Sequence, residues 1–255
     1  MTWANLRDAV GLHTCSLSAV RSAGPGCCAV CRGYVKAGYL HCYNCALHRQ
    51  CAPGLLADLV VPIAYSVGGT GYATALWQYK SAAADAASRK SARAALRLIL
   101  LAFLHDHGRC LWSCAGVAAP THVAVVPSGR GCGGTHPLRS LAGSYLTLPW
   151  ADLVTRPGEP ALGRDLQVGR FRAAGRLTGA TVLLLDDTWT SGASAQSAAA
   201  ALKLAGARSV VTVILGRHLN PSDPKLNSFI AALAAYPFRQ DACAVHGIVG
   251  QFAAA

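Results

Sequence analysis

Acidic side chains are scarce in this chain. Its 255 residues include 11 Asp and Glu against 23 Lys and Arg, which gives a formal net charge of +12. This balance excludes an acidic surface and suits a polyanionic partner, either a nucleic acid or a substrate that carries pyrophosphate. An excess of arginine and alanine is also typical of a GC-rich genome, so the charge alone leaves both explanations open.

Long apolar runs are missing as well. No stretch of 18 apolar residues is free of charge, so we expect no membrane span. The apolar segment Ala94–Leu104 is too short for one and is typical of a core helix. The first residues, Met1–Asp8, lack the basic-then-apolar order of a signal peptide. These absences predict a cytoplasmic protein, in which the 11 cysteines indicate a metal site or free thiols rather than disulfides.

Seven of the cysteines fall before residue 52, and four of them form two CxxC pairs separated by ten residues. These four are Cys28, Cys31, Cys42 and Cys45. Each pair can place two thiolates on one tetrahedral Zn²⁺, and a site filled by four protein ligands has no open position for catalysis. We therefore predict a structural zinc site. A redox CxxC normally opens a helix in a thioredoxin-like unit, which the sequence does not show.

Neighbouring residues are alternative ligands for this zinc. Cys27 can take the place of Cys28, and His41, His48 and Cys51 are close enough in the sequence to replace one of the four cysteines. The sequence leaves this choice open.

The later cysteines and the histidines around Asp106 are explained without a metal site. The four cysteines after residue 53 are expected to be small buried hydrophobic residues. They are Cys110, Cys114, Cys132 and Cys243. His105 and His107 flank Asp106 and are interpreted as cations near the end of a helix, with a metal site as the alternative.

Pro53 and Gly54 form a natural boundary after the cysteine-rich segment. We expect a head over residues 1–53 and a main domain over residues 54–255. Apolar runs that alternate with helix-forming segments predict an α/β domain with a parallel sheet. The expected strands are Leu59–Tyr65, His122–Val126, Thr181–Leu185 and Val210–Leu215. The expected helices are Tyr72–Lys80, Ala84–His107 and Gly192–Ala205.

Two adjacent carboxylates, Asp186 and Asp187, follow the apolar run Thr181–Leu185. Two like charges at the end of a buried strand are costly unless they have a partner. In parallel sheets, ligands bind at the carboxyl ends of the strands. The carboxylates can accept hydrogen bonds from neutral hydroxyls, such as the 2′- and 3′-hydroxyls of a ribose. The alternative is a solvated turn.

A phosphate site is expected directly after the carboxylates, where the turn leads into the next helix. The N–H groups and the dipole of a helix N-terminus favour an anion. Thr190, Ser191 and Ser194 add hydroxyl donors, and Gly192 allows the backbone to come close. This stretch therefore predicts a site for a sugar that carries a 5′-phosphate.

A second loop, Pro127–Gly131, follows the strand His122–Val126 and should lie at the same edge of the sheet. Its Arg130 suits a pyrophosphate oxygen, because a guanidinium is always charged and binds in bidentate fashion. Farther along, the polar and basic segment Arg156–Arg176 predicts a mobile loop, with a solvated connection as the alternative.

The order of strand, Asp186-Asp187, two residues and then Thr190-Ser191-Gly192-Ala193-Ser194 resembles the phosphoribosyl pyrophosphate (PRPP) loop of type I phosphoribosyltransferases. Further parts make most of the chain similar to the ComF family of competence-associated proteins. These parts are the four-cysteine head, the segment Trp77–Lys80, the Pro127–Arg130 loop, and Gln167 with Arg170. The resemblance implies an α/β, type I phosphoribosyltransferase-like fold, with a parallel twisted sheet flanked by helices and a small zinc-ribbon-like head.

The chain departs from the family in two places. Relatives continue after the second loop with an Arg-Gly-Phe-Asn type of sequence, whereas this chain has Arg130-Gly131-Cys132-Gly133. Trp189 stands where many relatives carry a smaller residue, and it either lies over the sugar or packs against a neighbouring loop.

The resemblance implies that the chain binds PRPP together with Mg²⁺ and transfers its phosphoribosyl group to an unidentified nitrogen acceptor. Its implied catalytic residues are Asp186, Asp187 and Arg130. The implied PRPP contacts are Asp186, Asp187, Thr188, Thr190, Ser191, Gly192, Ala193, Ser194, Ser128 and Gly129. The alternative is a non-catalytic accessory of single-stranded DNA uptake, with single-stranded DNA or the DNA-uptake machinery as its partner.

Overall fold

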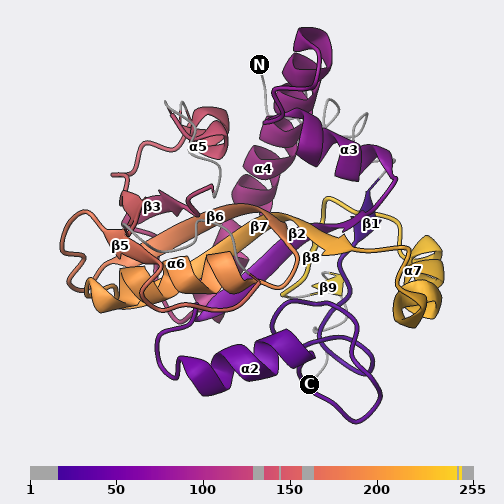
Figure 1. The fold of residues 1–255 in the computed structure, drawn as a ribbon, viewed down its shortest axis with the longest axis horizontal. Helices are drawn as coiled ribbons and strands as arrows, with labels where there is room; N and C mark the ends of the chain where they lie inside the picture. Colours follow the sequence, from indigo (N-terminus) through magenta and orange to yellow (C-terminus); the bar gives the residue numbers. More distant parts are fainter. Residues whose placement is uncertain (1–16, 129–134, 144, 157–163, 246, 249–255) are drawn as a thin grey trace.

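A five-stranded sheet forms the centre of the molecule (Figure 1). The computed structural model describes residues 17–128, 135–143, 145–156, 164–245 and 247–248. The strand order is β1-β2-β7-β6-β3. The strands are β1 (Ser18–Ala19), β2 (Leu59–Val67), β3 (His122–Val125), β6 (Thr181–Trp189) and β7 (Ser209–Leu219). Neighbouring strands are parallel except β1, which runs antiparallel to β2. The α/β class and the mostly parallel sheet are confirmed.

The sheet is covered on both faces, which explains why its central strands are nearly continuous apolar runs. Alternate residues of β6 belong to two different clusters, with Leu183 and Leu185 in one and Val182 and Leu184 in the other. The first cluster lies against α3 (Gly71–Gln78), α4 (Ala86–Cys114) and α5 (Pro137–Ala142). The second lies against α6 (Ala193–Leu204), which connects β6 to β7 in a parallel β-α-β unit.

Helix α4 is longer than the sequence predicts. The expected end was His107, but the helix continues to Cys114. The polar residues around position 106 indicated an end, yet Phe103, His107 and Leu111 are all buried, so the inward-facing side of the helix continues through them. Within the described part of the chain, no helix has both the length and the apolar character needed to cross a membrane.

The cysteine-rich head lies directly on the sheet. Its strand β1 pairs with β2, and its helix α2 (Tyr43–Cys51) begins inside the second CxxC pair, with Cys42 as the N-cap and Cys45 in the first turn. Cys28, Cys31 and Cys45 belong to the same hydrophobic cluster as the strand residues Val60 and Val182. The head and the sheet therefore share a core, and the division at residue 53 stays a prediction.

The described residues also form two small antiparallel strand pairs outside the central sheet. β4 (Leu153–Thr155) pairs with β5 (Phe171–Ala173), and β8 (Ala242–Cys243) pairs with β9 (Gly247–Ile248). Between β7 and β8 lie η1 (Pro224–Leu226), α7 (Asn227–Ala232) and η2 (Leu233–Ala235). The prediction of a mobile loop over Arg156–Arg176 is wrong for its second half, because β5 is a paired strand and Arg170 is fully buried. Residues 157–163 of that segment lie outside the described residues.

Candidate functional site

A step between neighbouring strands creates the candidate site. β3 pairs with β6 as far as Leu185, whereas β7 pairs with β6 as far as Trp189. The last residues of β6 therefore lie beyond the last pair with β3, at the carboxyl edge of the sheet. A cleft of about 490 Å³ opens there. Its lining includes Lys80, Ser128, Asp186, Asp187, Thr188 and Ser194.

Asp187 already has two partners in this cleft. The phenol of Tyr79 donates a hydrogen bond to its Oδ2 at 2.5 Å, and the ammonium of Lys80 lies 2.7 Å from the same oxygen. Burial and the neighbouring carboxylate raise the pKa of Tyr79, so its phenol remains a donor. The Asp187 side chain is 13% exposed, while that of Lys80 is 39% exposed. A protein cation therefore reaches the cleft beside the carboxylates.

Asp186 lies in a different environment from its neighbour. Its Oδ1 accepts a hydrogen bond from the backbone N–H of Asp187 at 2.9 Å. Burial, together with the charge of Asp187, raises the pKa of Asp186 to about 7. The two adjacent carboxyl groups thus hold a proton that comes off near neutral pH, and a ligand that contacts them is expected to change this protonation.

The turn between β6 and α6 depends on a glycine and a tryptophan. Gly192 has φ +84°, the left-handed region, and precedes the first residue of α6. A Cβ at Gly192 would lie 2.0 Å from Cζ2 of Trp189, which is 1% exposed. The indole of Trp189 is therefore packed inside the protein, against the turn that contains Gly192. The hydroxyl of Ser191 accepts a hydrogen bond from the N–H of Ala193 at 3.3 Å.

The predicted contact residues divide into three groups. Ser128, Asp186, Asp187, Thr188 and Ser194 line the cleft. Thr190, Ser191, Gly192 and Ala193 form the turn and the start of α6, with only Thr190 exposed. Gly129 and Arg130 lie outside the described residues, so their predicted role at the second loop is not tested.

Four residues at the site were not predicted from the sequence, namely Tyr79, Lys80, His136 and His218. Lys80 and both histidines line the cleft, and burial lowers the pKa of each histidine. A signal for Lys80 was present, because α3 starts directly after the carboxyl end of β2, a strand that is parallel to β7 and β6. The contact with Asp187 joins residues 107 positions apart, which no local pattern indicates.

Arg170 adds a buried positive charge beside the start of α6. Its guanidinium donates to the carbonyl oxygen of Asp165 at 2.7 Å, to Gln167 Oε1 at 3.3 Å and to Ser194 Oγ at 3.3 Å. The backbone N–H of Gln167 donates in turn to Ser197 Oγ at 3.0 Å. The segment before β5 is thus attached to the first turns of α6, where an anion is favoured.

The four predicted zinc ligands are brought together. Cys28, Cys31, Cys42 and Cys45 have sulfur atoms that all lie within 4.8 Å of one another, and Cys31 Sγ is 3.7 Å from Cys42 Sγ. Tetrahedral Zn–S bonds of about 2.3 Å place two sulfur atoms about 3.8 Å apart, so this arrangement fits zinc. The N–H of Cys42 also donates to Cys28 Sγ at 3.3 Å.

Thiols at this spacing cannot all ionise without a cation. Hydrogen bonds among the four thiols lower the pKa of Cys28 and raise that of Cys45. A metal ion would remove this conflict by holding all four as thiolates. The cluster is therefore a candidate structural zinc centre with four protein ligands.

The alternative ligands are not part of this cluster. The thiol of Cys27 instead donates to the carbonyl oxygen of Arg32 at 3.4 Å, and burial raises its pKa. Cys51 is exposed, and burial lowers the pKa of His48. His41 is likewise outside the cluster. Cys28, and not Cys27, completes the set of four.

Arg217 connects the cysteine cluster to the turn after β6. This residue lies near the end of β7, and its Nη1 donates to the carbonyl oxygen of Trp189 at 3.0 Å. A Cβ at Gly33, two residues after Cys31, would lie 2.4 Å from Arg217 Nη2, so the guanidinium packs closely against the head. One side chain thus contacts both the segment that holds the thiols and the turn that leads into α6.

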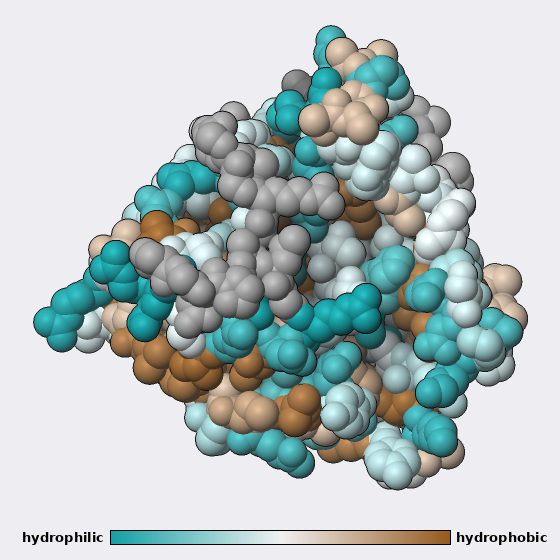
Figure 2. All heavy atoms as spheres, in the orientation of Figure 1, coloured by the Kyte–Doolittle hydropathy of each residue, from teal (hydrophilic) through white to brown (hydrophobic). Residues whose placement is uncertain are grey.

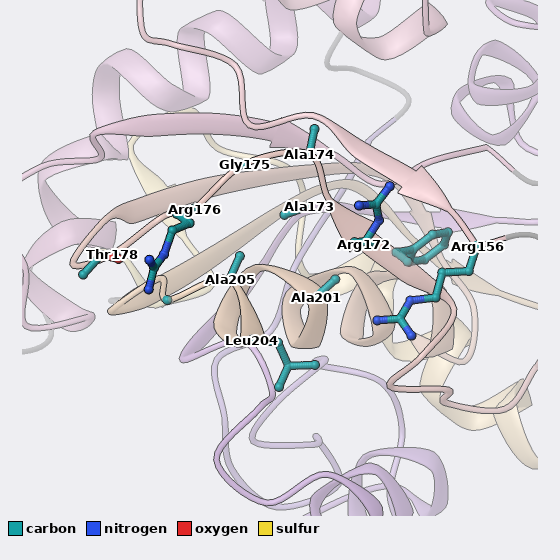
Figure 3. A pocket seen from close by; sticks show the side chains of 12 residues that line it. Arg156, Arg172, Ala173, Ala174, Gly175, Arg176, Thr178, Ala201, Leu204 and Ala205 are labelled. Carbon is teal, nitrogen blue, oxygen red and sulfur yellow. The ribbon is translucent and has the colours of Figure 1, made fainter.

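A separate pocket of about 480 Å³ is lined by Arg156, Arg172 and Arg176. Arg156 and Arg172 lie at one end of the pocket and Arg176 at the other, with Leu204 of α6 below them (Figure 3). On the face seen in Figure 2, hydrophobic side chains at the lower left are bordered by hydrophilic ones. This pocket shares no lining residue with the cleft at Asp186.

No protein-family model matches this chain, and no curated protein matches it either. What the molecule does must therefore be inferred from the carboxylate cleft, the turn into α6 and the four-thiol cluster. Of these, the cleft offers both acceptors and donors to a ligand, whereas four protein ligands would close the zinc centre.

Proposed function

We propose that this chain binds PRPP together with Mg²⁺ in the cleft at the carboxyl edge of the sheet, as a phosphoribosyltransferase-like protein of the ComF type. The observation that carries the proposal is that Asp186 and Asp187 line the same cleft as Ser194, in the first turn of α6. Carboxylate acceptors and the start of a helix thus line one cleft, which supports a ligand that carries both sugar hydroxyls and a phosphate.

The 5′-phosphate is assigned to the start of α6. First-turn N–H groups of a helix have no partner within the helix and point toward a ligand in front of it. The hydroxyls of Thr190, Ser191 and Ser194 add donors, and the Arg170 guanidinium lies 3.3 Å from Ser194 Oγ. Gly192, with φ +84°, forms the turn that leads into this helix.

The ribose hydroxyls are assigned to the two carboxylates. An ionised carboxylate only accepts hydrogen bonds, so neutral hydroxyls are suitable partners, while a phosphate is not. Tyr79 and Lys80 hold Asp187 in place through its Oδ2. Because Lys80 also lines the cleft beside these carboxylates, we assign it a second role, which is to offset the negative charge of the ligand.

The proposed reaction is a displacement at C1 of the ribose. The bond between C1 and the pyrophosphate oxygen breaks, a bond from C1 to an acceptor nitrogen forms, and the acceptor releases a proton. The sugar acquires oxocarbenium character, so catalysis consists mainly of positioning and electrostatic stabilisation. Mg²⁺ would neutralise pyrophosphate oxygens. From the resemblance, Arg130 would contact the pyrophosphate.

The zinc centre has a structural role in this proposal. Four protein ligands leave no open position on the metal. Zinc would hold the head against the sheet. Arg217, which packs against the head, would then hold the turn at Trp189 through its hydrogen bond to the Trp189 carbonyl oxygen. We propose a cytoplasmic setting, in which the thiols stay reduced.

Thermal unfolding with and without PRPP and Mg²⁺ tests the proposal. We expect PRPP to raise the Tm of the wild type by several degrees, because a ligand that binds only the folded state stabilises it. Asp187→Asn should abolish the rise, whereas Asp223→Asn, which lies at the start of η1 outside the cleft, should keep it. Absence of a shift with every phosphoribosyl compound would overturn the proposal.

A second candidate function is binding of single-stranded DNA without catalysis, and the pocket lined by Arg156, Arg172 and Arg176 favours it. Arginines beside apolar side chains suit a nucleic-acid backbone. Fluorescence titration with an oligonucleotide should then show affinity that falls steeply with salt and weakens in Arg156→Ala with Arg172→Ala. A flat titration at low salt contradicts this candidate.

A further inference from the structure

A second group of metal-ligating side chains lies outside both sites described so far. His107 and Cys110 are three residues apart on α4, so they project from the same side of the helix. Cys243 reaches them from β8, near the other end of the chain. One ligand atom from each of the three residues lies within 4.8 Å of the other two.

This group is largely shielded from solvent. His107 is 4% exposed and Cys243 is 6% exposed, while Cys110 is half-buried. Cys243 belongs to the same hydrophobic cluster as Leu111 of α4, and Cys110 packs against that cluster. Two thiols and an imidazole that meet in such surroundings, from segments far apart in the sequence, form a group that a metal ion can join.

The hydrogen bond of the His107 ring suits a metal ligand. Its Nε2 lies 2.8 Å from the carbonyl oxygen of Gln240, and a carbonyl only accepts, so Nε2 carries the hydrogen. The lone pair is then on Nδ1. Metal-bound histidines commonly donate their other ring N–H to a carbonyl or carboxylate, which fixes both the tautomer and the ring orientation. The ring of Phe103, with its centroid 5.1 Å from that of His107, supports the imidazole from the side.

We propose that His107, Cys110 and Cys243 bind a second Zn²⁺, separate from the one at the four-cysteine cluster. Thiolate and imidazole ligands select zinc or another thiophilic ion over Mg²⁺ and Ca²⁺. Three protein ligands leave the fourth tetrahedral position open to water or to a small ligand. The ion connects β8 to α4 and so fixes the segment that follows α7. This site is independent of PRPP binding.

Zinc content of the purified full chain, kept reduced and supplied with Zn²⁺ alone, tests the proposal. Mass spectrometry should find two zinc ions per wild-type chain and one in Cys243→Ser or Cys110→Ser. Cys45→Ser, at the four-cysteine cluster, should also lose one. Cys114→Ser is the matched control, because Cys114 is exposed and lies on the same helix, and it should keep both ions.

Replacement of zinc by Co²⁺ gives a second readout that does not depend on one variant folding well. The near-ultraviolet absorption of the cobalt protein should lose thiolate-to-metal charge-transfer intensity in Cys110→Ser, a substitution at a half-buried position, and keep it in Cys114→Ser. One zinc ion in the wild type, or a zinc content that Cys243→Ser and Cys110→Ser both leave unchanged, overturns the proposal. A wild-type chain with a single zinc ion and a Cys110–Cys243 disulfide overturns it as well.

Discussion

A Cβ at Gly192 would lie 2.0 Å from Cζ2 of the buried Trp189. The turn between β6 and α6 is therefore closed by an indole packed against a glycine backbone, and the helix start that is proposed to bind phosphate rests on this contact. The contact also explains why a large side chain fits at position 189, because the indole fills the space beside Gly192.

Gly192→Ala should consequently be more damaging than the same change at a glycine of equal conformation. Gly69 has the same φ, +84°, but no atom lies within 4 Å of the position that a Cβ would take there. Gly69→Ala should cost about 1–2 kcal/mol for the left-handed backbone, and Gly192→Ala about 1–3 kcal/mol more because of the clash. Urea unfolding of the two variants measures the difference. Equal costs contradict the packing of Trp189.

The raised pKa of Asp186 predicts a pH-dependent stability. Between about pH 4 and its folded-state pKa of about 7, the unfolded carboxyl is ionised while the folded one keeps its proton. The folded state therefore binds more protons, and this group makes the protein less stable as the pH rises through that window.

Asp186→Asn removes this titration and keeps an acceptor for the N–H of Asp187. The Tm of the variant relative to the wild type should rise by a few degrees between pH 4.5 and pH 8, since about 1 kcal/mol corresponds to 2–4 °C in a chain of this size. Asp223→Asn supplies the baseline. A Tm difference that does not change with pH is inconsistent with a buried, raised Asp186.

Arg217 is predicted to stabilise both the head and the turn. Arg217→Met leaves the buried carbonyl oxygen of Trp189 without this donor, which should lower the unfolding free energy by about 1–3 kcal/mol. Zinc should also leave the protein faster in a chelator competition, because the guanidinium packs against the head. Arg208→Met, at an exposed position of the loop before β7, is the control. Identical stability and zinc release in the two variants argue against the connection.

Local sequence patterns predicted the buried parallel strands and the helix between them. The apolar runs at Thr181–Leu185 and Val210–Leu215 gave the parallel unit around α6, because buried strands leave a continuous hydrophobic signal. The strand β6 continues through Asp186 and Asp187 to Trp189, which two charges argued against. Pairing with β7 overrides that local preference.

The candidate site shows the same division. The two carboxylates are adjacent and the four clustered cysteines are close in sequence, so their spacing identified them. The choice of Cys28 over Cys27 required the geometry of the backbone, which directs Cys27 toward the carbonyl of Arg32. Lys80 reaches Asp187 only through the packing of α3 on the sheet, and Cys243 reaches His107 only through the path of the C-terminal segment.

Isothermal titration of PRPP into the wild-type chain with Mg²⁺ at pH 7.5 tests the central proposal most directly. We expect one binding site per chain, with ribose 5-phosphate binding more weakly because it lacks the pyrophosphate. Asp187→Asn should lose at least tenfold in affinity, about 1.4 kcal/mol, while Asp223→Asn should bind as the wild type does. A folded wild-type protein that gives no binding heat, and no competition, with any phosphoribosyl compound would contradict the account.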